Sequence, residues 1–278
     1  MKLIKVERNG ATAEGVLNGD EIRIVTPWRN CAADDAPFIL SRLSPDELRQ
    51  QVTIEIVPLV SVTLAVPIDP LAKIFCVGMN YHDHVIEIKQ EVSANPTIFT
   101  RSLDTLAPHG APVVRPKVSD NFDFEGEIAI VIGREARHVS AADAMTYVGG
   151  YTCFMDGSVR DYQKHSLTAG KNFRRSGSMG PWIVTAEEFA VDDPLLRTRL
   201  NGEQVQSARA SQMIFDIPTV IEYISRWMVL RPGDVIATGT PGGVGSRREP
   251  PLWMKAGDRI EVEVAGIGVL ANPVIDES

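Results

Sequence analysis

Two glutamates, Glu125 and Glu127, stand two residues apart at the start of the apolar run Ile128–Ile132. Side chains of a strand alternate between its two faces, so residues i and i+2 point in the same direction. The near-continuous apolar run is typical of a strand that is covered on both faces. Two carboxylates side by side at such a place repel each other and lose hydration, and a nearby cation would compensate for both costs.

A third acid, Asp156, ends a second apolar segment, residues 149–156. Three carboxylates without a histidine or cysteine cluster favour a hard divalent cation bound through oxygen, Mg²⁺ or Mn²⁺. For the Glu-x-Glu pair taken alone, solvated surface carboxylates beside an unrelated aspartate are the commoner explanation, because most carboxylates in proteins are exposed. The residues by themselves leave both explanations open.

The elements that must position these acids are mostly short strands. Residues 1–66 alternate with turns at the two Asn-Gly steps, and Ser44 with Glu47 predicts the start of a short helix. Strand 57–64 then leads into a proline-rich joint. The pattern predicts a boundary there, which divides the chain into domains of residues 1–68 and 69–278.

The second domain is predicted to be strands with a few helices. Strands are expected over residues 72–80, 96–101, 125–133, 151–156, 181–185, 233–239 and 259–270. Helices are expected over residues 82–92, 140–148 and 211–230, with Pro218 near the start of the last helix or at a kink in it. This order is not a regular β-α-β alternation, so it disfavours a doubly wound sheet or a TIM barrel. A β-rich α+β fold fits better.

Composition and charge exclude several classes of function. The 278 residues carry a net charge of −8 without a basic stripe, which argues against a nucleic acid or an anionic membrane as partner. The three cysteines form no CxxC pair, and no apolar run reaches the length of a membrane span or a signal core. We therefore expect a cytoplasmic protein. The chain also lacks a phosphate-binding P-loop and a Gly-x-Ser-x-Gly elbow, which disfavours nucleotide binding and serine hydrolase chemistry.

An ordered set of segments makes the chain similar to a known family. The segments are GMNYHDH, PTIFTR, FEGEIAIVIG, GYTCFMDGSVRDYQ, GKNF, GPWIVT, NGE, GDVIATGTPGGVG and KAGDRIEVEVAGIGVLANPV. Together they resemble the fumarylacetoacetate hydrolase family in its smaller prokaryotic form, over roughly residues 70–275. The resemblance implies a mixed β-sandwich roll for the second domain, beside a small β-rich N-terminal domain.

The resemblance also implies a metal site and a class of substrate. Members of the family hold Mg²⁺ or Mn²⁺ with three carboxylates, which correspond here to Glu125, Glu127 and Asp156. Calcium is a possible substitute in crystals. Family substrates are 2-oxo acids or related 1,3-dicarbonyl acids, which chelate the ion through carboxylate and ketone oxygens. The metal then acts as a Lewis acid on the enolate that forms at that end.

His84 and Glu87 are three residues apart, so a helix would place both on one face. A surface His–Glu pair is the ordinary explanation of such spacing. The family pattern N-Y-x-x-H selects His84 over His82 and implies a catalytic pair on a mobile lid. There the glutamate orients the histidine, and the histidine activates a water molecule.

The resemblance assigns further roles to residues around the acids. Lys171 is implied as a catalytic partner for oxyanion charge, and Arg160, Gln163, Thr240 and Arg101 as substrate-binding residues. Arg160 has a second implied role, bracing a metal-ligand carboxylate. Thr240 stands in a loop whose glycines are equally explained by a tight turn. Many relatives have lysine in place of Arg101.

We therefore expect a metal-dependent hydrolase that cleaves a C–C bond in an acylpyruvate or related β-diketo acid, giving pyruvate and a carboxylic acid. The same apparatus supports oxaloacetate decarboxylation or an isomerase, hydratase or lyase step on a 2-oxo acid. A non-catalytic binding module is the remote alternative. A homodimer is implied by the relatives. The segment 174–180, unusual for the family, is expected to add two positive charges near the mouth of the site.

Overall fold

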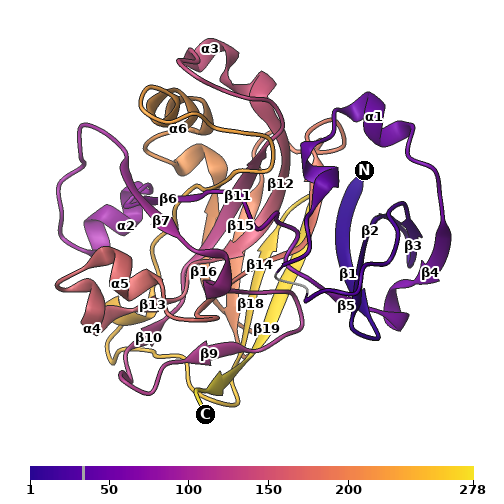
Figure 1. Cartoon of the computed structure of the whole chain (residues 1–278). Helices are drawn as coiled ribbons and strands as arrows, with labels where there is room; N and C mark the ends of the chain where they lie inside the picture. Colours follow the sequence, from indigo (N-terminus) through magenta and orange to yellow (C-terminus); the bar gives the residue numbers. More distant parts are fainter. Residues whose placement is uncertain (33–34) are drawn as a thin grey trace.

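The structure is a computed structural model that describes residues 1–32 and 35–278. Within these residues, a mixed sheet of 12 strands runs across the whole molecule (Figure 1). Its path is β4-β3-β2-β1-β14-β12-β11-β17-β6-β7, with β5 beside β1 and β8 beside β14. The strands of this sheet are β1 (Lys2–Arg8), β2 (Ala11–Asn18), β3 (Glu21–Ile24), β4 (Glu55–Pro58), β5 (Thr63–Leu64), β6 (Ile74–Gly78), β7 (Thr97–Arg101), β8 (Leu106–Ala107), β11 (Gly126–Ile132), β12 (Val148–Met155), β14 (Gly177–Thr185) and β17 (Val235–Ala237).

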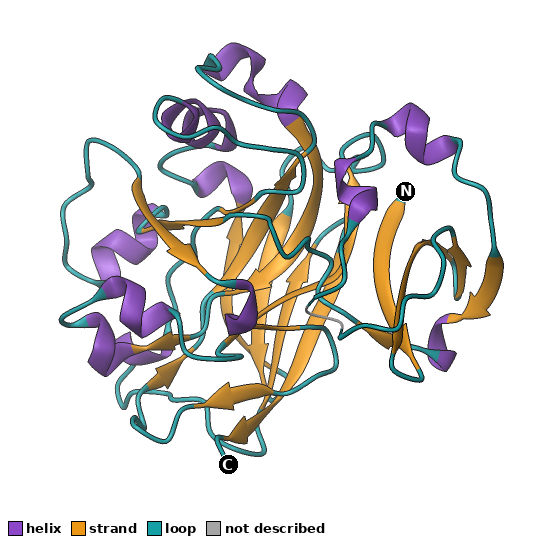
Figure 2. Cartoon of the chain, in the orientation of Figure 1, coloured by secondary structure: helices purple, strands orange, loops and turns teal. Residues whose placement is uncertain are grey.

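A second sheet packs against one face of the long sheet, and helices lie around the outside (Figure 2). The second sheet has the order β16-β15-β18-β19-β9. Its strands are β9 (Val113–Arg115), β15 (Leu195–Leu200), β16 (Glu203–Arg209), β18 (Arg259–Val264) and β19 (Gly268–Asp276), and a separate pair consists of β10 (Phe122–Asp123) and β13 (Ser158–Val159). The helices are α1 (Pro45–Arg49), α2 (His82–Glu87), α3 (Ala141–Ala144), α4 (Arg160–Gln163), α5 (Leu167–Lys171) and α6 (Ile217–Ser225). This is the mixed, strand-rich α+β fold that the sequence predicts.

Alternation along β11 divides the core into two layers. Ile128 and Ile130 point into the cluster between the two sheets, whereas Ala129 and Val131 point into the cluster on the opposite face, which also holds Phe154 of β12. The strand is buried along its whole length, as its apolar sequence predicts. The same alternation sets the direction of the acids at its start.

The N-terminal strands continue the long sheet, because β1 is hydrogen-bonded antiparallel to β14. They also have an apolar cluster of their own, which includes Ile4, Ile22 and Val57. The division into domains at residues 68 and 69 therefore stays a prediction. Within the described residues, no helix is both long and apolar enough to cross a membrane.

Several predicted elements differ from the structure. The predicted strand 57–64 is two short strands, β4 and β5, separated by a 3₁₀ turn at Leu59–Ser61. The predicted helix 82–92 ends at Glu87, because the chain reverses at Lys89, whose φ is +56°. Helix α6 is shorter than predicted and has Pro218 in its first turn, after the N-cap Asp216. Strands β15 and β16 and helices α4 and α5 were not predicted from the sequence.

Candidate metal centre and adjoining cavity

The three acids that the sequence singles out, Glu125, Glu127 and Asp156, meet in the structure. One ligand oxygen each from Glu125, Glu127 and Asp156 lies within 4.8 Å of the others, and all three residues are buried. Strands β11 and β12 are antiparallel neighbours with Glu127 opposite Phe154, and the backbone N–H of Asp156 donates to the Glu125 carbonyl over 2.8 Å. Pairing of adjacent strand ends therefore brings the acids together.

Gly126 separates the two glutamates because strand β15 lies directly beneath it. A Cβ at this position would come within 2.0 Å of the Thr198 hydroxyl oxygen. The Glu-Gly-Glu sequence thus places two carboxylates on one face of β11 and lets the second sheet approach closely on the other.

Three cationic side chains surround two of the acids. Lys171 Nζ lies 2.6 Å from Glu125 Oε2 and 2.5 Å from Asp156 Oδ2. Arg160 contacts Glu125 Oε1 over 2.7 Å, and Arg101 forms a buried ion pair with Asp156. Burial disfavours charge on the Lys171 amine, but Asp156 and Glu125 outweigh it and raise its pKa. Lys171 is therefore an ammonium that belongs to the acid cluster.

Glu127 has no ion pair with any described residue, and its Oε2 accepts one hydrogen bond, from the Gly239 N–H over 2.8 Å. Burial, reinforced by Asp156 and Glu125, raises the pKa of Glu127 well above its usual range. Burial also disfavours charge on Glu125, but Lys171 and Arg160 lower the pKa of Glu125 to about 2. The cluster thus contains one carboxylate whose negative charge lacks compensation.

This donor set fits a hard divalent cation. Three buried carboxylates offer oxygen ligands at one point, and the uncompensated Glu127 is the group that a cation would hold in its charged form. Lys171 and Arg101 hold Glu125 and Asp156 in place, whereas Glu127 has no ion pair with any described residue. The three acids could therefore bind a divalent cation, and the identity of the ion stays a prediction.

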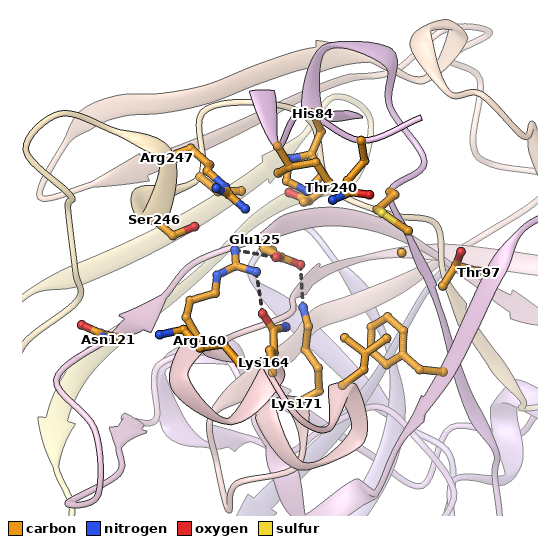
Figure 3. A pocket seen from close by; sticks show the side chains of 18 of the residues that line it. His84, Thr97, Asn121, Glu125, Arg160, Lys164, Lys171, Thr240, Ser246 and Arg247 are labelled. Carbon is orange, nitrogen blue, oxygen red and sulfur yellow. Dashed lines mark hydrogen bonds and ion pairs between the residues drawn. The ribbon is translucent and has the colours of Figure 1, made fainter. Parts of the chain in front are cut away.

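A cavity of about 650 Å³ opens beside the acids (Figure 3). The predicted residues that line it are His84, Glu125, Arg160, Gln163, Lys171 and Thr240. Figure 3 shows Glu125 between Arg160 and Lys171 at the floor, with His84 across the cavity from Lys171. Six residues from distant parts of the sequence therefore share one space large enough for a small organic acid.

The predicted His84–Glu87 pair forms on helix α2, where Nδ1 of His84 lies 3.2 Å from Glu87 Oε2. The other oxygen of Glu87 accepts the Gly243 N–H over 3.0 Å. Gly243 has a φ of +99°, a conformation that favours glycine, so this loop geometry depends on the residue type. Burial disfavours charge on Glu87, but its hydrogen bonds from His84 and Gly243 prevail and lower its pKa. The pair is held by the loop as well as by its own helix.

Three predicted substrate-binding residues already have protein partners. The Thr240 hydroxyl donates to the Gly126 carbonyl over 3.0 Å, and Gln163 accepts a hydrogen bond from Arg160 over 2.8 Å. Arg101 is buried, does not line the cavity, and contacts Asp156 and the Ser176 hydroxyl. Arg101 thus braces a candidate metal ligand here, and its contact with substrate stays a prediction that this placement does not favour.

The segment 174–180 does not supply the charges expected at the mouth of the cavity. Neither Arg174 nor Arg175 lines it, and Arg175 is tied by its backbone N–H to the Asp104 carbonyl over 3.1 Å. The segment continues into β14, next to Arg101. Positive charge reaches the cavity instead from Arg247 and Lys164, which the sequence analysis did not single out.

Asp123 is a further site residue that the sequence analysis missed. It is fully buried, its Oδ2 pairs with Arg160 over 2.8 Å, and its two oxygens accept the N–H groups of Gly245 and Ser246 over 2.7 and 3.0 Å. Asp123 therefore joins the floor of the cavity to the loop on its opposite side. The signal was present, because Asp123 precedes Glu125 by the same two-residue step that joins the glutamates.

Comparisons with known proteins agree with this geometry. The family model for the fumarylacetoacetate (FAA) hydrolase C-terminal domain matches residues 73–275. Oxaloacetate tautomerase YisK of Bacillus subtilis is 41% identical over 211 residues, 74% of this chain and 70% of its own. The mitochondrial oxaloacetate tautomerase Fahd2a of Rattus norvegicus is 37% identical over 224 residues, 79% of this chain and 72% of its own.

Solved structures extend the similarity to the whole chain. A fumarylacetoacetate hydrolase from Exiguobacterium antarcticum has a TM-score of 0.83 with 32% identity, and covers 100% of both chains. A 5-carboxymethyl-2-hydroxymuconate delta-isomerase from Mycobacterium smegmatis has a TM-score of 0.81 with 33% identity over 100% of both chains.

Proposed function

Because the chain belongs to the fumarylacetoacetate hydrolase family, we propose that it is a metal-dependent enzyme that interconverts the enol and keto forms of a small 2-oxo acid. The observation that carries this proposal is the convergence of Glu125, Glu127 and Asp156, of which Glu125 lines the cavity together with His84 and Lys171. Relatives named as tautomerases and isomerases favour proton transfer over the C–C hydrolysis that the sequence analysis put first.

Each residue has a definite task in this proposal. A divalent cation bound by the three acids would supply Lewis acidity toward the oxygens of the 2-oxo acid. Lys171 adds a fixed positive charge where the enolate oxygen develops. Toward the enol, His84 removes the proton from the adjacent carbon and the enolate oxygen takes a proton from water; toward the keto form, water takes the oxygen proton and His84 protonates the carbon. Glu87 keeps the imidazole oriented. Arg160 holds Glu125 in place.

To test this proposal, the rate at which the protein converts the enol form of oxaloacetate is measured from the loss of enol absorbance, in the presence of Mg²⁺ or Mn²⁺. We expect accelerated conversion to the keto form that disappears with a chelator and returns when metal is added. Conversion that continues undiminished in chelator would contradict the proposal. A His84→Gln variant provides the matched comparison, and we expect its turnover to fall by roughly 100-fold.

Hydrolysis remains a second candidate because His84 and Glu87 form the pair that would activate water. Pyruvate release from acetylpyruvate and CO₂ release from oxaloacetate, measured beside enol conversion, separate hydrolysis, decarboxylation and tautomerisation. We expect enol conversion to be at least about tenfold faster than either of the others. A faster release of pyruvate would assign the enzyme to hydrolysis instead.

Two further expectations belong to this proposal: a homodimer, which the family resemblance implies, and a cytoplasmic location, which the cysteine pattern and the lack of a signal core indicate. A homodimer predicts a species of about twice the 30.4 kDa chain mass in light scattering. The cytoplasmic assignment is tested by fractionating the source cells.

A further inference from the structure

Four cationic side chains line the cavity, and they differ in their partners. Lys171 and Arg160 are tied to buried acids at the floor. At the rim, the largely exposed Lys164 lies 3.8 Å from Asp161. The guanidinium of Arg247 has no hydrogen bond or ion pair with any residue that the structure describes.

The backbone around Arg247 is nevertheless held firmly. Asp123 accepts the N–H groups of the two preceding residues, Gly245 and Ser246. The following residue, Arg248, donates to the carbonyls of Gly243 and Val205 over 3.1 and 2.6 Å. A fixed loop thus presents an unpaired guanidinium, so no backbone ordering is needed when an anion binds there, only ordering of the side chain.

The direction of Arg247 is toward the cavity. Figure 3 shows its side chain extending over the floor from the side that also carries Ser246, toward Glu125 and across from Lys171. Its charge also contributes to the lowered pKa of Glu87, which places it near the His84–Glu87 pair. Arg247 therefore faces the space that a bound acid would occupy beyond the metal end.

Charge balance explains why such a group would be needed. The negative charge of the three acids is offset in part by the positive charges of Lys171 and Arg101. A divalent cation would then make the net charge of this group positive. The carboxylate next to the ketone of a 2-oxo acid neutralises that excess. Asp123 and Arg160 balance each other, so Arg247 is left as a positive charge that a second carboxylate would complement.

We propose that Arg247 is the specificity-determining residue that binds the distal carboxylate of the substrate, which makes the substrate class dicarboxylic 2-oxo acids. The planar guanidinium suits bidentate binding of a carboxylate. This inference rests on the proposed function, because the metal end has to bind the 2-oxo acid group.

The experiment compares two ligands of equal chain length, oxaloacetate and 2-oxobutanoate, in which a methyl group replaces the distal carboxylate. Their Kd values are measured by rapid ultrafiltration with Mg²⁺ present, for the unmodified protein and for Arg247→Gln. We expect the substitution to weaken oxaloacetate binding by roughly 10- to 100-fold and to leave 2-oxobutanoate binding within about twofold. Arg247→Lys is expected to recover part of the loss, because it keeps the charge without the fork.

Arg248→Gln is the matched control, since it disturbs the same loop without removing the cavity-facing charge. We expect it to leave the ratio of the two Kd values unchanged. An unaltered oxaloacetate Kd in Arg247→Gln, or a parallel loss for both ligands, overturns the role of Arg247 while the proposed function stands. If neither ligand binds the unmodified protein with Mg²⁺, the proposed function fails first, and this inference fails with it.

Discussion

Charged side chains are buried and paired at the floor of the cavity, whereas at its rim they are exposed or unpaired within the described residues. At the floor, Glu125, Asp156 and Lys171 are buried and joined by contacts of 2.5–2.6 Å. At the rim, Lys164 is 78% exposed and Arg247 is unpaired within the described residues. Buried charges are costly unless they are paired, so every residue at the floor constrains its neighbours. Exposed charges lack this constraint and remain available to a ligand.

The difference separates two tasks. Under the proposed function, the chemistry at the floor needs fixed geometry, because the candidate metal ligands and a protonated lysine must keep their positions. The rim, as proposed for Arg247, selects which molecule reaches that chemistry. Substitutions at the floor are therefore expected to affect stability and turnover together, whereas substitutions at the rim affect substrate choice.

The strongest test of this separation is Asp156→Asn. The amide removes one candidate metal ligand and leaves Arg101 and Lys171 with a neutral partner in a buried place. We expect turnover to fall by about 1,000-fold or more and the free energy of unfolding to fall by about 3–5 kcal/mol. Enol conversion, bound metal and chemical denaturation measure the three effects. Full metal content in this variant would show that Asp156 is not a ligand.

Asp123→Asn tests the connection between floor and rim. Asp123 accepts two backbone N–H groups of the loop and pairs with Arg160. In the asparagine variant, the side-chain NH₂ group would replace one of these acceptor oxygens and would face another hydrogen-bond donor. We expect a loss of about 2–4 kcal/mol in the free energy of unfolding, because a buried charge loses its partner. Loosening of the loop should raise KM more than it lowers kcat. An unchanged KM with lower stability would limit Asp123 to a structural role.

The floor could be predicted from the sequence for a physical reason. Strand alternation converts the spacing of Glu125 and Glu127 into a shared direction, and the end of the neighbouring apolar run supplies Asp156. Strand periodicity thus predicts that the acids lie together. The helical spacing of His84 and Glu87 likewise predicts the pair on the opposite side of the cavity.

The rim could not be predicted in the same way. Arg247 reaches the cavity only because Asp123, more than a hundred residues earlier, fixes the backbone before it. Arg174 and Arg175 looked equally available in the sequence, yet neither lines the cavity, and the backbone N–H of Arg175 donates to the Asp104 carbonyl instead. Long-range contacts decide which arginine faces a site, and such contacts cannot be predicted from the local spacing of residues in the sequence.

Glu127→Gln sharpens the contrast within the floor itself. Glu127 has no cationic partner in the described structure, and its raised pKa means that negative charge is unfavourable there. At neutral pH we expect the free energy of unfolding of the metal-free variant to be about 1 kcal/mol higher than that of the metal-free unmodified protein. The variant should nevertheless bind metal poorly. This gain in stability is the reverse of the loss expected for Asp156→Asn. A destabilised metal-free variant would show that the carboxylate is compensated after all.

The raised pKa of Glu127 also fixes the sign of a pH effect. A carboxyl group with a raised pKa stabilises the metal-free fold below its ordinary value of about 4.3, and this contribution is lost as pH rises toward the folded value. Denaturation curves of the metal-free protein should therefore show this decline from Glu127, and Glu127→Gln should remove it. Saturating Mg²⁺ should remove it as well, because the cation favours the charged form. A decline of the same size in Glu127→Gln would trace it to another group.

The smallest expected effect is that of Lys164→Gln, which tests whether any rim cation can do what Arg247 is proposed to do. Lys164 lines the same cavity, but its ammonium is solvated and lies 3.8 Å from Asp161. Such an exposed pair contributes little, so we expect less than about 0.5 kcal/mol in the free energy of unfolding. The preference for oxaloacetate over 2-oxobutanoate should change by less than about threefold, because a mobile ammonium binds a carboxylate without fixed geometry. A loss of preference as large as that in Arg247→Gln would spread the recognition of the distal carboxylate over the whole rim.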